Sequence, residues 1–291
     1  MSSQPGQIRE RSSVAFTAAP TRSGRGQLEL CLVNGRTVAT RAEASNPLKW
    51  LVPRRSTPAA WAYASTFGGG LLAGDEIEMQ VAVRPGASAV VSTQSSTKVY
   101  RSPTGATTTQ TLNAHVDDDA LLVVAPDPVT CFAGARYEQR QIVHLMPKAN
   151  LVYVDWLTSG RRARGERWQF AHYRSRLDIY QNSKRLLTDA LTLNPDDGPL
   201  DSPFRMGQFN CYAVLVLSGA GVEAQSQALL TDVDAQPVSP GNPVVEAASA
   251  LTSGVIWRIA GQTTEQVSQV LTARLAFLSQ ILGDTPWARK W

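Results

Sequence analysis

The chain has 291 residues, of which 43% are hydrophobic and 18% are charged, and its formal net charge at pH 7 is +4. This composition is typical of a soluble globular protein and excludes an intrinsically disordered one. No segment approaches the run of about 18 apolar residues that a membrane-spanning helix needs, so we expect no membrane partner.

The first segment, residues 1–24, is rich in Arg and Ser and lacks the apolar core of a secretory signal. We interpret it as a flexible tail rather than a transit peptide, followed by a single β domain over residues 25–291. Cys31, Cys131 and Cys211 form no CxxC pattern, and the three histidines lack the local spacing of a metal clasp. These features indicate buried thiols in a reducing, cytoplasmic setting and no tight preformed metal site.

Alternation with a period of two dominates the chain. Between positions 76 and 83, Ile77, Met79, Val81 and Val83 alternate with more polar residues, which predicts a strand with one buried face. Further strands are predicted in six later segments: 107–116, 120–126, 140–145, 150–157, 166–182 and 209–218. Because short polar turns and no helices separate them, the pattern predicts a mostly β protein and opposes a parallel α/β sheet.

Helices are predicted only in the C-terminal third. Residues 221–230 are long enough for about two turns of α-helix, at about 3.6 residues per turn. The segment 263–282 has a capping box at Thr263 and Gln266, and its stripe of Val and Leu residues predicts an amphipathic helix. Two segments rich in Pro, Gly and Asp, 194–207 and 234–244, are predicted to be loops.

The segment 92–101 (STQSSTKVYR) poses a catalytic question. Ser95 and Lys98 have the Ser-x-x-Lys spacing of penicillin-recognising hydrolases, which place the motif at the start of a helix. Here the motif follows a β-rich segment, and continued alternation would put Thr93 and Ser95 on one face and Gln94 on the other. A Ser/Lys hydrolase is therefore the weaker alternative.

Two other motifs fail as catalytic sites. The glycines at 68–74 are followed by Asp75 and Glu76 rather than the Lys of a phosphate-binding loop. In the segment 155–168, Asp155 and Glu166 flank three arginines, which would oppose the raised pKa of a general acid. Because Glu166 interrupts its basic run, we expect no nucleic-acid partner.

Four ordered motifs nevertheless resemble the UreD (UreH) family of urease accessory proteins. They are 69–75 (GGLLAGD), 93–101 (TQSSTKVYR), 132–137 (FAGARY) with Gln139, and 160–166 (GRRARGE). The resemblance covers about residues 25–185, with the later helix and closing Trp fitting as well. Ala73, the pair Ser95-Ser96 and the long N-terminal tail depart from the family pattern and suggest a divergent branch.

The resemblance implies an elongated domain of helical or layered β-sheet that carries two α-helices. It implies a noncatalytic metallochaperone scaffold that binds the urease apoprotein and recruits UreF and, through it, the GTPase UreG. A structural adaptor without a nickel path is the alternative. Nickel would be in transit, with no tightly bound cofactor, and dispersed oxygen ligands suit that role because they release the ion readily.

Candidate site residues follow from the same motifs. The hypothetical nickel path consists of four carboxylates: Asp75, Glu138, Asp155 and Glu166. The candidate motif or partner contacts are Gly70, Gly74, Thr93, Gln94, Lys98, Tyr100, Arg101, Gly160, Arg161 and Gly165.

Overall fold

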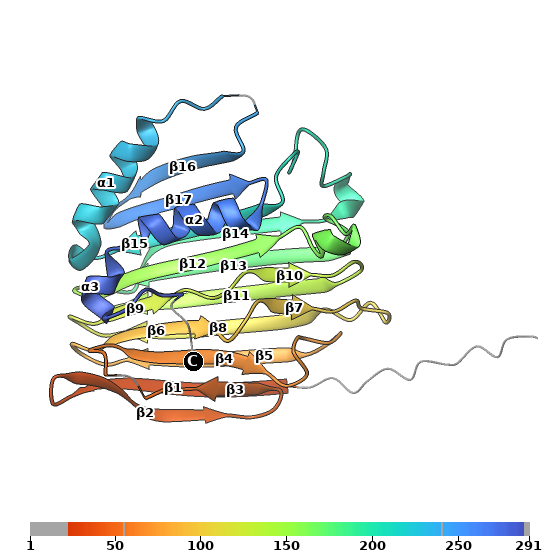
Figure 1. Cartoon of the computed structure of the whole chain (residues 1–291). Coiled ribbons are helices and arrows are strands. Elements are labelled where there is room, and N and C mark those ends of the chain that lie inside the picture. Colours follow the sequence, from red (N-terminus) through yellow and green to blue (C-terminus); the bar gives the residue numbers. More distant parts are fainter. Residues whose placement is uncertain (1–22, 55, 240, 288–291) are drawn as a thin grey trace, which may run out of the picture.

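The computed structural model describes residues 23–54, 56–239 and 241–287. In Figure 1 the strands run side by side and stack into an elongated, layered β structure, with helices α1 and α2 on one face. Residues 1–22 of the predicted tail lie outside the described residues, whereas Ser23 and Gly24 already belong to strand β1. Across the described ranges, no helix has the length and hydropathy that a membrane span requires.

Two sheets make up the structure. The first, in spatial order, contains β14 (Lys184–Leu193), β13 (His172–Gln181), β11 (Arg136–Leu145), β8 (Thr108–Val116), β5 (Glu76–Val83), β1 (Ser23–Val33) and β2 (Arg36–Ala44). The second contains β16 (Val244–Leu251), β17 (Gly254–Gly261), β15 (Cys211–Ser218), β12 (Asn150–Thr158), β9 (Leu121–Val124), β6 (Ser88–Thr93), β4 (Ala60–Thr66) and β3 (Leu48–Leu51). The short strands β7 (Thr97–Val99) and β10 (Val129–Cys131) extend it beside β12.

The middle of each sheet is parallel, although in the described residues no α-helix connects its strands. Consecutive strands alternate between the sheets, since β5 leads into β6 and β8 leads into β9. Ser88 of β6 lies opposite Leu121 of β9, which in turn lies opposite Asn150 of β12. This coil of about 30 residues is typical of a β-solenoid. A strand of the opposite sheet thus provides the long crossover that parallel neighbours require.

The predicted alternation places the cores. Ile77, Met79, Val81 and Val83 of β5 face inward and are buried between the two sheets. A second core lies on the outer face of the ten-stranded sheet, where helices cover it. It includes Trp61, Tyr63, Val90, Trp257, Val267 and Leu271.

The helices are α1 (Glu223–Asp234), α2 (Thr264–Arg274) and α3 (Leu278–Leu282). The capping box is confirmed, because Thr263 Oγ1 accepts from the backbone N–H of Gln266 while Gln266 Oε1 accepts from that of Thr263. The predicted single helix over 263–282 is divided into α2 and α3, and α1 extends beyond 221–230. Helices α1 and α2 contact strands of the ten-stranded sheet. They therefore cover part of the outer face of that sheet.

Candidate functional site

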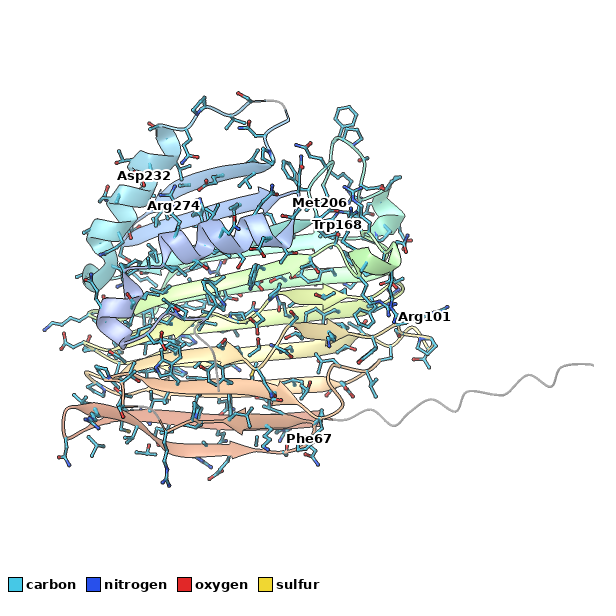
Figure 2. All side chains as sticks on the ribbon, viewed as in Figure 1. Phe67, Arg101, Trp168, Met206, Asp232 and Arg274 are labelled. Atoms are coloured by element: carbon cyan, nitrogen blue, oxygen red, sulfur yellow. The ribbon has the colours of Figure 1, made fainter. Side chains whose placement is uncertain are left out.

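The four motifs meet along one side of the solenoid, where the turns between its strands stack. Leu71 pairs with Val99 in a parallel bridge, and Val99 pairs with Cys131 between β7 and β10. The backbone N–H of Phe132 donates to the Val99 carbonyl at 2.9 Å, which adds the third motif to the same ladder. Figure 2 shows Phe67, Arg101, Trp168 and Met206 one above another along the same side of the stack. Segments that are far apart in sequence therefore form one surface.

Gly70 and Gly74 shape the first motif. A Cβ on Gly70 would lie 2.6 Å from the Tyr100 ring and 2.8 Å from the Lys98 carbonyl oxygen, so only glycine fits between these strands. Gly74 has a φ of 80°, in the left-handed region that favours glycine. The Asp75 carboxylate accepts a hydrogen bond from the Leu72 N–H at 2.8 Å and is buried. Asp75 thus holds this turn together.

The second motif forms the wall of a cavity of about 90 Å³. Thr93, Gln94, Ser95 and Lys98 all line it. The expected alternation fails here because β6 ends at Thr93 and the chain bends over Gln94 and Ser95, so these three residues reach the same cavity. Ser95 lies in this bend and Lys98 lies on β7, which is not the helix start that Ser/Lys chemistry needs.

A second cavity, of about 50 Å³, lies deeper between the sheets. It shares five lining residues with the first cavity, and these form a common wall: Ala64, Met79, Thr93, Thr97 and Gln110. Its inner part is lined by Gln139, Gln141 and Asp155. Such a volume is enough to hold water, because one water molecule needs only about 10–15 Å³ of this kind of space.

Asp155 is the centre of a polar network in this interior. Its Oδ2 atom accepts hydrogen bonds from Gln139 Nε2 at 2.7 Å and from Ser175 Oγ at 2.8 Å. Gln139 Nε2 also lies 3.1 Å from the Tyr173 hydroxyl, and the Tyr137 hydroxyl donates to Gln139 Oε1 at 3.3 Å. Desolvation raises the pKa of Asp155, although the two hydrogen bonds oppose that effect. A carboxyl group in such a place is costly unless it is satisfied.

Gln141 adds an open hydrogen-bond acceptor to the same cavity. The side chain is buried, and its Oε1 atom has no hydrogen-bond partner among the described residues. Gln139 and Gln141 share the inner face of β11 with Tyr137. Glu138, between Tyr137 and Gln139, faces outward and contacts His172 at 3.0 Å. Sequence reasoning missed Gln139 and Gln141 as site residues, although amides on an otherwise apolar alternating face were a usable signal.

The fourth motif forms a second polar cluster on the same side of the solenoid. The Arg161 guanidinium lies 4.0 Å from the centre of the Phe132 ring and donates from Nε to Glu166 Oε2 at 2.9 Å. The hydrogen bond from Arg161 is the main cause of the lowered pKa of Glu166, as expected from the neighbouring arginines. Gly160 and Gly165 have φ values of 120° and 78°, which let the loop fold back on itself.

This cluster borders an open depression of about 600 Å³ whose wall includes Tyr100, Arg101, Phe132, Arg161 and Glu166. Tyr100 meets Phe132 edge to face at 5.1 Å. Of the four carboxylates predicted to form a path, only Asp155 lines the deep cavity; Asp75 holds a turn, Glu138 faces outward and Glu166 pairs with Arg161. Within the described ranges, no group of three His, Cys, Asp or Glu residues could hold a metal ion.

Comparison with known proteins adds the family context. The family model described as UreD urease accessory protein matches residues 22–291. A urease accessory protein UreD of Sorangium cellulosum is 46% identical over 93% of this chain and 85% of its own length. One from Anaeromyxobacter is 40% identical over 92% and 90%, and the urease accessory protein D of Oryza sativa subsp. indica is 35% identical over 95% and 98%.

Proposed function

This chain belongs to the UreD family of urease accessory proteins, and we propose that it is a noncatalytic scaffold that passes nickel toward the urease apoprotein. In this proposal the nickel ion is cargo, and it moves through the polar interior of the solenoid. The observation that carries the proposal is the position of Asp155, a half-buried carboxyl group in the lining of the second of two adjoining cavities.

The lining of the path suits an ion that must leave again. Hydroxyl and amide oxygens of Thr93, Gln94 and Gln141 are weak ligands for nickel, and the carboxylates of Asp127 and Asp155 line the deep cavity beside them. Burial raises the pKa of Cys131 well above its usual range and that of Cys211 to about 12, so neither thiol offers the strongly binding thiolate near pH 7.

Proton exchange accompanies the passage of the ion. A metal ligand must be deprotonated, and desolvation raises the pKa of Asp155. A divalent cation at the deep cavity therefore competes with a proton, and its occupancy falls as the pH falls through this raised pKa.

The side of the solenoid that carries the four motifs is the proposed docking surface for protein partners. Phe67 is 52% exposed on this side, Phe204, two residues before Met206, is 99% exposed, and the depression beside Arg161 lies on the same side. Exposed aromatic side chains and arginines are the residue types enriched at protein interfaces. We assign urease, UreF and, through UreF, UreG as partners, in the cytoplasm.

The test is reconstituted urease activation with Asp155→Asn, a change that keeps the shape of the side chain and removes its charge. The control is Glu138→Gln, because Glu138 faces away from the cavities. We expect Asp155→Asn to recover urease and UreF in a pull-down yet to activate urease about tenfold more slowly, while the control behaves as wild type.

Two results would contradict the proposal at different levels. Wild-type activation by Asp155→Asn would remove the path and leave a structural adaptor. Failure of the unaltered protein to recover either urease or UreF would remove the scaffold itself.

A further inference from the structure

The outer face of the seven-stranded sheet carries a row of stacked rings. In the parallel register, His115 of β8 lies opposite His144 of β11, and His144 lies opposite Tyr180 of β13. The two imidazole rings are 4.7 Å apart between centroids and 9° from parallel, and the Tyr180 ring follows at 5.2 Å from His144. This row lies on the other side of the sheet from the interior cavities, because inward and outward side chains alternate along each strand.

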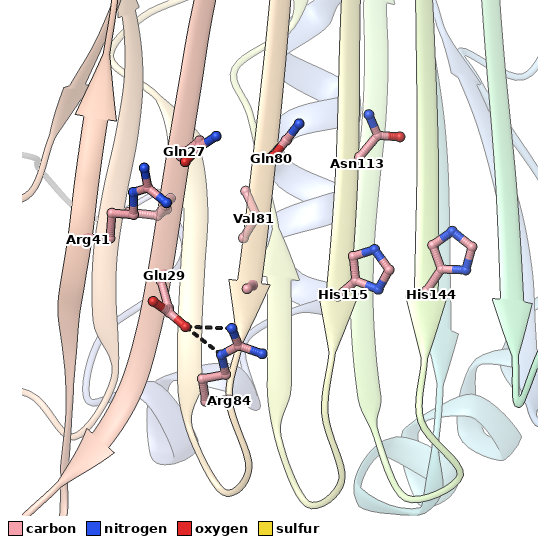
Figure 3. Close-up of a pocket in the computed structure, with 11 residues that line it drawn as sticks. Gln27, Glu29, Arg41, Gln80, Val81, Arg84, Asn113, His115 and His144 are labelled. Carbon is pink, nitrogen blue, oxygen red and sulfur yellow. Dashed lines mark hydrogen bonds and ion pairs between the residues drawn. The ribbon is translucent and has the colours of Figure 1, made fainter.

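An open depression of about 440 Å³ gives solvent access to the histidines. Figure 3 shows His115 and His144 side by side on neighbouring strands, with Asn113 and Gln80 farther along the same face. The nearby charges are already compensated. Arg84 bonds Glu29 at 2.6 Å, as the dashed lines in Figure 3 mark, and lies 3.7 Å from Asp117.

We propose that His115 and His144 form an exposed two-imidazole site for a borderline divalent cation of the class of Ni²⁺, Zn²⁺ and Cu²⁺. Imidazole nitrogen is a favoured ligand for these ions, whereas Mg²⁺ and Ca²⁺ prefer oxygen. The proposal is independent of the interior path, since it involves neither of the cavities that Asp155 adjoins.

The spacing of the strands fits this chemistry. Neighbouring strands lie about 4.8 Å apart, and a metal bound to two nitrogens at about 2.0–2.1 Å holds those nitrogens within about 4 Å of each other. Rotation of the rings about their terminal side-chain bonds can bring them to that separation without moving the backbone. With no third His, Cys, Asp or Glu gathered near them among the described residues, water completes the coordination.

The Arg185 guanidinium lies 5.8 Å from the centre of the Tyr180 ring, beyond His144 in the row of rings.

The alternative is that the stacked rings only stabilise the sheet. We therefore compare the full-length protein with His115→Phe and His144→Phe, which keep an aromatic ring in the stack and remove the ligand atoms. His172→Phe is the control, because it removes a histidine that lies outside this pair, beside Glu138. The measurement is calorimetric titration with Ni²⁺ alone at pH 7.5, with circular dichroism to confirm the fold.

We expect each Phe variant to remain folded and to bind one Ni²⁺ fewer, or to bind it on the order of 100-fold more weakly, because the second linked contact is lost. The double variant should be no worse than either single variant. Equal Ni²⁺ stoichiometry and affinity in wild type and in the variants of His115 and His144 would overturn the site. An equal loss of Ni²⁺ in His172→Phe would overturn it as well.

Discussion

Replacement of Gln139 by Leu tests the polar network around Asp155. Gln139 Nε2 donates to the Asp155 carboxylate at 2.7 Å, and a hydrogen bond to a charged group contributes about 1.5–3 kcal/mol. Gln139→Leu should therefore lower the free energy of unfolding by about 1.5–3 kcal/mol more in wild type than in an Asp155→Ala background, where that carboxylate is absent. The excess is the coupling between the two side chains.

The assay is urea unfolding of the four proteins of this cycle, followed by tryptophan fluorescence at pH 7 and at lower pH. Desolvation raises the pKa of Asp155 above its value in the unfolded chain. Ionisation of Asp155 therefore lowers the free energy of unfolding as pH rises from the unfolded-state pKa through the folded-state pKa. The coupling should shrink when acid protonates Asp155. This reasoning would be refuted if Gln139→Leu lowered the free energy of unfolding by amounts that agree within about 0.5 kcal/mol in the two backgrounds at pH 7.

Three further outcomes are expected. Gly70→Ala should lower the free energy of unfolding by about 1–3 kcal/mol in urea titrations, because its Cβ would overlap a ring and a carbonyl oxygen; an unchanged midpoint would oppose this packing. Arg161→Ala should return the pKa of Glu166 upward toward its ordinary value in a carboxyl NMR titration, and an unmoved titration would show that another group sets it. The Cys131 and Cys211 thiols, whose pKa values burial raises, should resist alkylation at pH 8 in mass spectrometry until urea unfolds the chain; rapid native labelling would contradict their burial.

Local sequence patterns predicted the strands better than their partners. The alternation at 76–83 correctly identified β5 and its buried face, because that information lies within eight residues. The pattern could not show that β5 and β6 belong to opposite sheets, or that β6 pairs with β9 one coil later. The coils share no recognisable sequence repeat, so the register depends on stacking between segments about 30 residues apart.

In the candidate site, too, local sequence was a better guide to which segments form it than to the direction in which their side chains point. The motif containing Thr93 and Gln94 lines a cavity, and the bend after β6, rather than the alternation expected from the sequence, decides which of its side chains face that cavity. The four candidate carboxylates were selected from the family motifs, and three of them serve a turn, a surface contact or an ion pair. The uncharged amides of Gln139 and Gln141 reach the interior instead, because their position on β11 rather than their charge decides which way they point.

The coil construction affects how such a protein can change in length. Each added coil of a solenoid would lengthen the stack by about 4.8 Å and leave most existing neighbours in place. The network of Gln139, Asp155 and Ser175 joins β11, β12 and β13, so it bridges successive rungs rather than lying within one. Insertion of a rung between β11 and β13 would separate Gln139 from Ser175, whereas growth at the β1 end would leave both beside Asp155. The molecule can therefore tolerate extension at one end far better than at its polar middle.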